Sequence, residues 1–306
     1  MKPVLVTDDL DSLPTGISRI RSLPDPKLRA LWDSIVIPDK KRDNLVSQAA
    51  LNFAVRGRID REDLPLHGII LLTGLPGTGK TSLARGLANR VAETFPKKHF
   101  RLLEVEPHSL TSSAMGKTQR AVSDLFGQTI AEAAAQGPTI VLLDEVETLA
   151  VDRSRLSMDA NPIDIHRATD AVLVKLDSLA EQYPNLLFVA TSNFPDAIDE
   201  AFLSRCDLVM EVSLPNAEAR LSILRKCLEG VGRTFPGVGA LATSTGLDAV
   251  AAECDGLDGR ALRKMVANAM AGSMETAVDP NRLTIEGLVA AARAARTSRK
   301  RDGGAK

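Results

Sequence analysis

The chain has 306 residues, and 44% of them are hydrophobic, so it can bury a normal core without disulfide or metal staples. Its 38 lysines and arginines nearly balance 39 aspartates and glutamates, and a net charge of -1 excludes a general attraction for nucleic acid or anionic membranes. Three cysteines without CxxC spacing argue against a disulfide framework or a zinc cluster. Neither a signal peptide nor an apolar run of about 18 residues is visible, so we expect a cytoplasmic protein without a membrane partner.

Residues 1–30 mix Asp, Pro, Ser and Gly without periodicity, and we expect an irregular N-terminal arm. Apolar positions in residues 31–58 predict a helix that leads toward the first strand. Five short apolar runs follow, at 68–73, 100–105, 139–144, 186–191 and 208–213, with room for helices between them. This alternation predicts an α/β domain over residues 31–215 with a parallel five-stranded sheet covered on both faces.

The pattern changes after Pro215. Residues 217–228, 259–276 and 285–295 predict helices without intervening strands, so we expect a small C-terminal α-helical domain over residues 216–296. Residues 297–306 combine a basic run with two glycines and predict a disordered basic tail, for which a docking role is the alternative.

A phosphate-binding loop follows the first apolar run, at Gly74-Leu75-Pro76-Gly77-Thr78-Gly79-Lys80-Thr81, and a helical stretch continues through Ser82. The sequence matches G-x-x-x-x-G-K-[ST] in its required setting between a strand and a helix. Glycines let successive N–H groups point at phosphates, and the helix N-terminus adds partial positive charge. We therefore expect this segment to bind ATP, with Lys80 on the phosphates and the Thr81 hydroxyl on Mg²⁺. A glycine-rich turn before an ordinary helix is the alternative.

Two later apolar runs end in polar residues. Residues 139–144 end at Asp144 and Glu145, and residues 186–191 are followed by Asn193. In a parallel sheet such strand ends meet the ligand at one edge. We expect Asp144 to bind Mg²⁺, Glu145 to act as general base on the attacking water, and Asn193 to orient that water. Taken singly, each strand end is also compatible with solvent capping or turn chemistry.

Together these motifs resemble those of an AAA+ ATPase. The stretch Ile198-Asp199-Glu200-Ala201-Phe202-Leu203-Ser204-Arg205 is similar to the segment that carries the family's arginine finger. The resemblance implies that Arg205 reaches the γ-phosphate of a neighbouring subunit, so hydrolysis would require an oligomer. Gly256-Leu257-Asp258-Gly259-Arg260 resembles the sensor-2 motif, in which Arg260 contacts the nucleotide of its own subunit. A surface arginine is the alternative for Arg205, and Arg263 is an alternative sensor.

Four segments are similar to one branch, the pachytene-checkpoint family, known also as thyroid hormone receptor interactor 13. They are Leu31-Trp32-Asp33-Ser34, residues 103–110, residues 143–149 and Gly256-Leu257-Asp258-Gly259-Arg260. The similarity spans about residues 31–271. Eukaryotic members carry an adaptor domain where about thirty residues stand here. The chain therefore resembles the compact bacterial form, whose relatives accompany HORMA proteins and second-messenger nucleotidyltransferases in anti-phage defence.

The resemblance implies a homo-hexamer that pulls a flexible segment of a HORMA-domain client into its central pore. The first pore loop, aromatic in many AAA+ unfoldases, contains Ala114, Met115 and Gly116 here, and Met115 can grip a peptide by apolar contact. A second polar loop, residues 152–161, is expected to line the same pore, with a solvated face or a contact between subunits as alternatives. His108 and His166 are expected to be structural rather than metal ligands.

The resulting expectation is an ATP-driven hexameric remodeller, with an AAA+ α/β ATPase domain followed by a helical lid, that regulates a bacterial anti-phage nucleotide-signalling system. A DNA-directed AAA+ ATPase of the clamp-loader or helicase-loader type would share the nucleotide motifs. With 3% aromatic residues and no long basic stripe, the chain favours a protein partner, and we expect no nucleic acid. A scaffold that uses ATP only to assemble is the second alternative, against which Glu145 argues.

Overall fold

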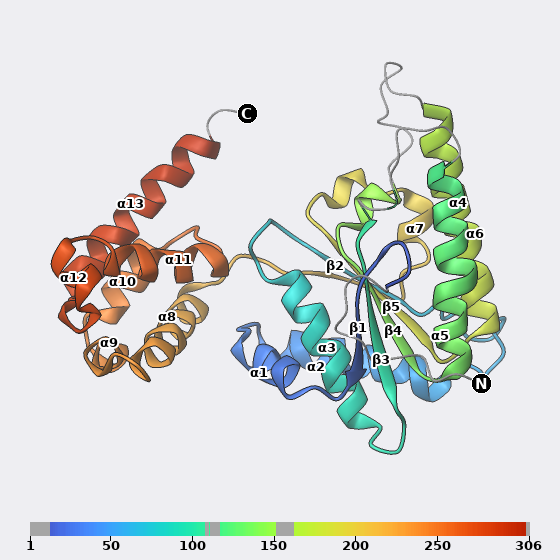
Figure 1. The fold of residues 1–306 in the computed structure, drawn as a ribbon, viewed down its shortest axis with the longest axis horizontal. Coiled ribbons are helices and arrows are strands. Elements are labelled where there is room, and N and C mark those ends of the chain that lie inside the picture. Colours follow the sequence, from blue (N-terminus) through green and yellow to red (C-terminus); the bar gives the residue numbers. More distant parts are fainter. Residues whose placement is uncertain (1–12, 108–109, 111–116, 151–161, 304–306) are drawn as a thin grey trace. The chain divides into compact units, whose positions relative to one another are not determined.

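The computed structural model describes residues 13–107, 110, 117–150 and 162–303, and Figure 1 shows its fold. The strands in these ranges are β1 (Ile17–Leu23), β2 (Ile69–Thr73), β3 (Phe100–Val105), β4 (Thr139–Leu143), β5 (Leu186–Ser192) and β6 (Leu208–Glu211). The five apolar runs predicted as strands are confirmed as β2 to β6. Within the same ranges, none of the helices is both long and apolar enough to cross a membrane.

The first helices are α1 (Pro26–Ser34), α2 (Asp39–Val55), α3 (Lys80–Thr94), α4 (Lys117–Asp124), α5 (Ala131–Gln136), α6 (Pro162–Gln182) and α7 (Glu200–Leu203). Six π-helical residues, Leu125–Ile130, join α4 to α5. The single helix predicted over residues 31–58 is wrong, because α1 and α2 are separate helices. Pro38 lies between them, and a proline cannot donate the backbone hydrogen bond that a continuous helix requires.

The later helices are α8 (Ala217–Gly232), α9 (Pro236–Ala240), α10 (Leu247–Glu253), α11 (Gly259–Met270), α12 (Met274–Val278) and α13 (Ile285–Gly303), with short 3₁₀ turns at 146–148, 195–197, 241–243 and 280–282. The prediction of a disordered tail from residue 297 is wrong as far as Gly303, because α13 continues to that residue. Arg299 of α13 contacts Asp258 at 3.0 Å, which ties the end of this helix to the preceding ones.

The six strands form one sheet in the order β1-β3-β4-β5-β2-β6. Strands β2 to β6 pair in parallel, as expected, while β1 pairs with β3 in antiparallel fashion. The prediction of five strands, with an irregular arm over residues 1–30, is therefore wrong for Ile17–Leu23. This segment alternates polar and apolar residues weakly, and its pairing with β3 extends the sheet by one edge strand.

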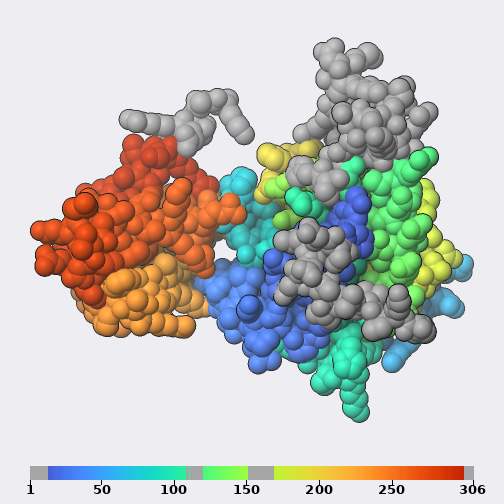
Figure 2. Space-filling model, viewed as in Figure 1, coloured from blue at the N-terminus to red at the C-terminus, as the bar shows by residue number. Residues whose placement is uncertain are grey.

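Helices cover both faces of this sheet (Figure 1). On one face α4 packs with α6, and alternate strand residues such as Leu71, Leu103 and Val141 join their side chains in one buried cluster. On the other, α3 contacts β2 to β5 and packs with α2. The side chains of α4 and α5, green in Figure 2, also form part of the surface. This layering agrees with the predicted α/β architecture.

The residues divide into two compact units. The first unit contains the residues up to Trp32, Asp39–Gly74 and Lys80–Glu211, and so includes the whole sheet. The second contains Asp33–Pro38, Leu75–Gly79 and the residues from Val212 onward. Its helices α8, α10, α11 and α13 enclose a separate apolar core. The second unit is thus the small helical body expected after the sheet, with short segments of the earlier chain added.

Candidate nucleotide site

The register of the sheet brings three strand ends to one edge. Thr73, the last residue of β2, pairs with Ser192 of β5, and Leu143, the last of β4, pairs with Ala190. Because the strands are parallel, the residues that follow them emerge on the same side of the sheet. We call this edge the nucleotide edge, defined by Lys80, Thr81, Asp144, Glu145 and Asn193.

The loop after β2 has the conformation that its glycines allow. The φ angles of Gly74, Gly77 and Gly79 are 138°, 83° and 96°, which lie in the region that other residues rarely adopt. A methyl group added to Gly79 would meet no atom within 4 Å, so open space lies beside the backbone there. Helix α3 begins at Lys80, with Thr81 and Ser82 in its first turn. The loop therefore has the glycine geometry and helix start of a phosphate cradle.

A chain of hydrogen bonds joins three of the predicted site residues. The buried Lys80 ammonium donates to Asn193 Oδ1 at 2.8 Å and to the Gly74 carbonyl at 2.7 Å. Asn193 Nδ2 donates to Glu145 Oε1 at 3.1 Å. The chemistry of the two partners determines the orientation of this amide, because an ammonium only donates and a carboxylate only accepts. Asn193 thus links the Lys80 ammonium to the carboxylate predicted as the base.

Thr81 and Asp144 form the second pair at this edge. Thr81 Oγ1 donates to Asp144 Oδ1 at 2.8 Å. A hydroxyl and a carboxylate oxygen side by side are hard oxygen donors of the kind that Mg²⁺ prefers, so the residues fit the predicted metal. In a nucleotide complex these two side chains would hold the ion, directly or through water, and the ion would neutralise phosphate charge.

Two further residues at this edge were not identified from the sequence. The buried Thr191 hydroxyl donates to Asp144 Oδ1 and accepts from the backbone N–H of Glu145 at 3.1 Å, so it holds both acidic residues. Glu147 Oε1 accepts from the backbone N–H of Asn193 at 3.1 Å. In the sequence, the polar strand end at 191–193 could have indicated Thr191, and the second glutamate after Asp144 could have indicated Glu147. Their roles depend on contacts between β4 and β5.

Glu145 has an unusual backbone conformation. Its φ of 56° and ψ of 53° are left-handed, and it is the one described residue other than glycine with a positive φ. Such a conformation costs about 1 kcal/mol or more and persists only where neighbours maintain it. Here the Thr148 backbone and hydroxyl both donate to the Glu145 carbonyl at 3.0 Å. Asp144 and Glu145 line a cavity of about 460 Å³, which provides room for water beside the base.

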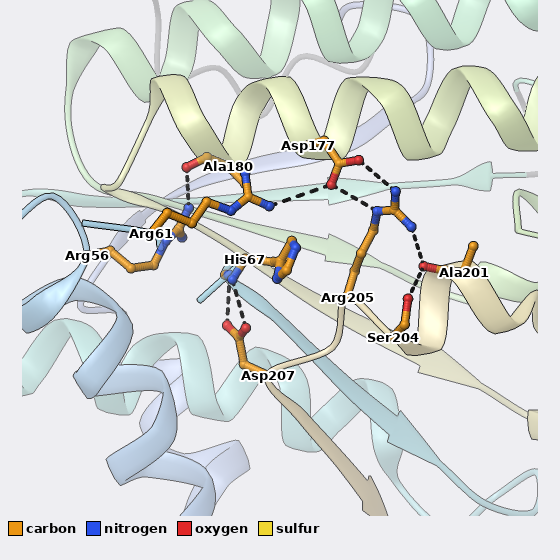
Figure 3. A network of polar contacts seen from close by, with 10 residues as sticks. Arg56, Arg61, His67, Asp177, Ala180, Ala201, Ser204, Arg205 and Asp207 are labelled. Atoms are coloured by element: carbon orange, nitrogen blue, oxygen red, sulfur yellow. Dashed lines mark hydrogen bonds and ion pairs between the residues drawn. The ribbon is translucent and has the colours of Figure 1, made fainter. Parts of the chain in front are cut away.

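Arg205 lies elsewhere in the first unit, just before β6 (Figure 3). Its guanidinium pairs with Asp177 of α6, where Nε and Nη2 donate to the two carboxylate oxygens at 2.9 and 2.7 Å. Asp207, two residues later, accepts from the backbone N–H groups of His67 and Gly68 at 2.8 Å each, at the start of β2. Arg205 is therefore at the end of the strands opposite the nucleotide edge. The predicted action of Arg205 on a neighbouring subunit stays a prediction.

Arg260 lies in the second unit, exposed on the first turn of α11. Asp258 caps this helix, because its Oδ1 accepts from the backbone N–H groups of Arg260 and Ala261 at 3.0 and 2.9 Å. The Arg260 amide also lies 3.3 Å from the Gly77 carbonyl. Arg263 donates to the backbone of Gly259 and Ser34. Ala114, Met115, Gly116, His108 and residues 152–161 lie outside the described residues.

Comparisons with known proteins identify the family of the chain. Residues 70–214 match the family described as "ATPase family associated with various cellular activities (AAA)". CD-NTase-associated protein 6 of Pseudomonas aeruginosa is 63% identical over 292 residues, which cover 95% of this chain and 96% of that protein. The chain belongs to the AAA ATPases, in their pachytene-checkpoint branch. This confirms the resemblance inferred from the sequence motifs.

Relatives in the same branch are longer than this AAA ATPase. The pachytene checkpoint protein 2 homologue of Oryza sativa subsp. indica is 36% identical over 214 residues, which cover 68% of this chain and 45% of that protein. The chain thus spans about half the length of that relative. Among solved structures, PCH-2 of C. elegans has a TM-score of 0.73 at 25% identity, covering 94% of this chain and 76% of that chain. The structure titled as the E. coli MS115-1 HORMA:CdnC:Trip13 complex contains a chain that matches with a TM-score of 0.74 at 19% identity. The match covers 90% of this chain and 94% of that chain, and it shows that the two share a fold.

Proposed function

We propose that this AAA ATPase hydrolyses ATP to remodel a HORMA-domain protein. The observation that carries the proposal is the connected set of Lys80, Asn193 and Glu145 beside the Thr81–Asp144 pair, in a chain closely related to CD-NTase-associated protein 6 over nearly its full length. A cation for phosphate, oxygen donors for Mg²⁺, and a carboxylate held by an amide are the parts that phosphoryl transfer to water requires.

In the proposed mechanism, the loop from Gly74 to Gly79 binds the phosphates through backbone N–H groups, and Lys80 exchanges its contact with Asn193 for the γ-phosphate. Thr81 and Asp144 would hold Mg²⁺, which would neutralise phosphate charge when bound. Glu145 accepts the proton of the attacking water. The Asn193 amide keeps the carboxylate of Glu145 oriented toward that water through its hydrogen bond to Oε1.

We further propose that the site is completed by a second copy of the chain, in a homo-hexamer. Arg205 would contact the γ-phosphate bound by the neighbouring subunit, and Arg260 would contact the nucleotide of its own subunit and couple hydrolysis to movement of the helical unit. The loop with Ala114, Met115 and Gly116 would hold a flexible segment of the client, so that each cycle pulls on it.

The client is proposed from two relatives. One is named for its association with a CD-NTase, and the solved complex of similar fold contains a HORMA protein and CdnC. A remodeller that removes a HORMA protein from a nucleotidyltransferase would control when the second messenger is made. On this basis we assign the chain to the regulation of an anti-phage nucleotide-signalling system.

A substrate trap tests this proposal. Glu145→Gln keeps the ATP-binding groups but removes the base, so with ATP it should remain bound to a purified HORMA-domain protein, offered alone and with its CD-NTase, through size-exclusion chromatography. Lys80→Ala is the matched control, because it loses the phosphate contact and should retain no client. Hydrolysis by Glu145→Gln at the parent rate would disprove the assignment of the base. If duplex DNA, offered in parallel, were retained and the HORMA-domain protein were not, the assignment of a HORMA-domain client would be disproved.

A further inference from the structure

The guanidinium of Arg205 is held by its own chain on all three nitrogens (Figure 3). Nε and Nη2 form a two-pronged contact with Asp177 at 2.9 and 2.7 Å, and Nη1 donates to the Ala201 carbonyl at 2.6 Å. A paired contact of this kind sets the orientation of a guanidinium as well as its position. Asp177 lies on α6 and Ala201 on α7, so two helices distant in the sequence determine where one side chain points.

These contacts leave part of the guanidinium available. An arginine side chain carries five N–H groups, and three are used here. Within the described residues, the hydrogen bonds of Arg205 leave one N–H on Nη1 and one on Nη2 for a further acceptor. The Arg205 side chain is 23% exposed, so it is accessible to such an acceptor although it is held in place.

The charge of Asp177 is stabilised by its surroundings. The hydrogen bond from Arg205 holds the pKa of the Asp177 carboxyl below its usual value, with further contributions from His67 and Arg61. Asp177 in turn raises the pKa of Arg205. Arg61 Nη2 lies 3.8 Å from Asp177 Oδ1, so the carboxylate has a second cation that does not touch Arg205. The pair therefore stays ionised at neutral pH.

We propose that Asp177 is a positioning residue for the proposed catalytic arginine. It holds the Arg205 guanidinium in one orientation, with two N–H groups presented to the phosphate of the neighbouring subunit. An unrestrained arginine loses rotamer freedom when it binds, whereas a pre-oriented one has already lost it on folding. This inference rests on the proposed function, in which Arg205 acts on a second subunit.

The first test separates turnover from ATP binding. Asp177→Asn keeps the size of the side chain but removes the charge and one acceptor oxygen. We expect kcat for ATP to fall about tenfold with KM within twofold, because the Lys80 loop of each subunit is unchanged. Arg61→Ala is the matched control, since it removes a cation near Asp177 without touching Arg205, and it should stay within twofold of the parent in both constants.

The second test shows whether the defect acts on a neighbour. Asp177→Asn subunits have an intact nucleotide edge and a misoriented Arg205, while Lys80→Ala subunits have the opposite combination. After subunit exchange, an equimolar mixture should hydrolyse more ATP than the two variants do separately. Damage within the Asp177→Asn subunit itself would not be restored in this way.

A parallel mixture of Arg205→Ala with Lys80→Ala distinguishes failure of the proposed role of Arg205 between subunits from failure of the inference about Asp177. Full activity of Arg205→Ala, or no restoration in its mixture, would overturn the role of Arg205 between subunits. If Arg205→Ala behaves as expected, the inference about Asp177 is overturned by any of three results for Asp177→Asn: activity equal to the parent, activity above the parent, or a loss that mixing does not restore.

Discussion

The two ends of the parallel sheet carry polar networks of different construction. At the nucleotide edge, the neutral amide of Asn193 links Lys80 to Glu145, and the lysine also donates to the Gly74 carbonyl. At the opposite end, Arg205 and Asp177 contact each other directly as an ion pair. The first arrangement keeps a cation ready for a ligand, and the second keeps a cation in one fixed orientation.

The two ends also differ in what supports them. Residues at the nucleotide edge follow strands, so the register of β2, β4 and β5 sets their spacing. At the opposite end, Arg56 bonds the carbonyls of Ala180 and Leu186 at 2.8 and 2.6 Å, and helix α6 supplies Asp177. Burial lowers the pKa of Arg56 to about 10, which still leaves it charged at neutral pH. Substitutions at the first end should therefore affect catalysis, and those around Arg56 should affect stability.

The largest effect is expected from Glu145→Gln, compared with Glu147→Gln. The first removes the proposed base and should lower kcat for ATP by at least about 100-fold. The second should change kcat by only a few-fold, because a glutamine oxygen can still accept from the Asn193 backbone N–H. Steady-state phosphate release measures both. Equal losses in the two variants would contradict the assignment of the base to Glu145.

Arg56→Met should lower the free energy of unfolding by about 2 kcal/mol, because it removes charge-assisted hydrogen bonds to two backbone carbonyls. Urea denaturation followed by circular dichroism measures this change. Arg58→Met is the control, since Arg58 is exposed and its loss should change stability by no more than about 0.5 kcal/mol. Similar losses in both variants would show that the buried contacts of Arg56 do not stabilise this end of the sheet.

A smaller effect is expected from Thr191→Val, which keeps the shape of the side chain but removes the hydroxyl shared by Asp144 and Glu145. We expect kcat to fall about tenfold with little change in the melting temperature. Thr139→Val is the matched control, because Thr139 is equally buried and lies at the start of β4, where its hydroxyl donates to the Gly137 carbonyl. If Thr139→Val lowers kcat as much as Thr191→Val, the Thr191 hydroxyl has no specific role in catalysis at the nucleotide edge.

The sequence predicted much of the fold because β2, β4 and β5 are nearly continuous apolar runs, and β3 and β6 are mostly apolar. Strand β1 is different, since Arg19 and Arg21 interrupt its apolar residues. Its position depends on pairing with β3, where Arg21 contacts the buried Glu104 at 3.3 Å. An edge strand of this kind is determined by its partner more than by its own composition.

The extent of α13 was also missed. A run of arginine and lysine near a chain end is typical of disorder, but both residues are good helix formers, and α13 continues the apolar helix before them. The contact between Arg299 and Asp258 adds a partner from another helix. Composition alone does not reveal such a partner.

The sequence by itself determined the phosphate loop, the acidic strand end and the following asparagine, because short-range spacing along one chain specifies each of them. Tertiary structure alone decided which groups these residues contact: the hydroxyl of Thr191 on both acids, the amide of Asn193 between Lys80 and Glu145, and the carboxylate of Asp177 on Arg205. The physical reason is the distance along the sequence between the residues involved. Motifs are local, whereas each of these contacts joins residues brought together only by strand register or helix packing.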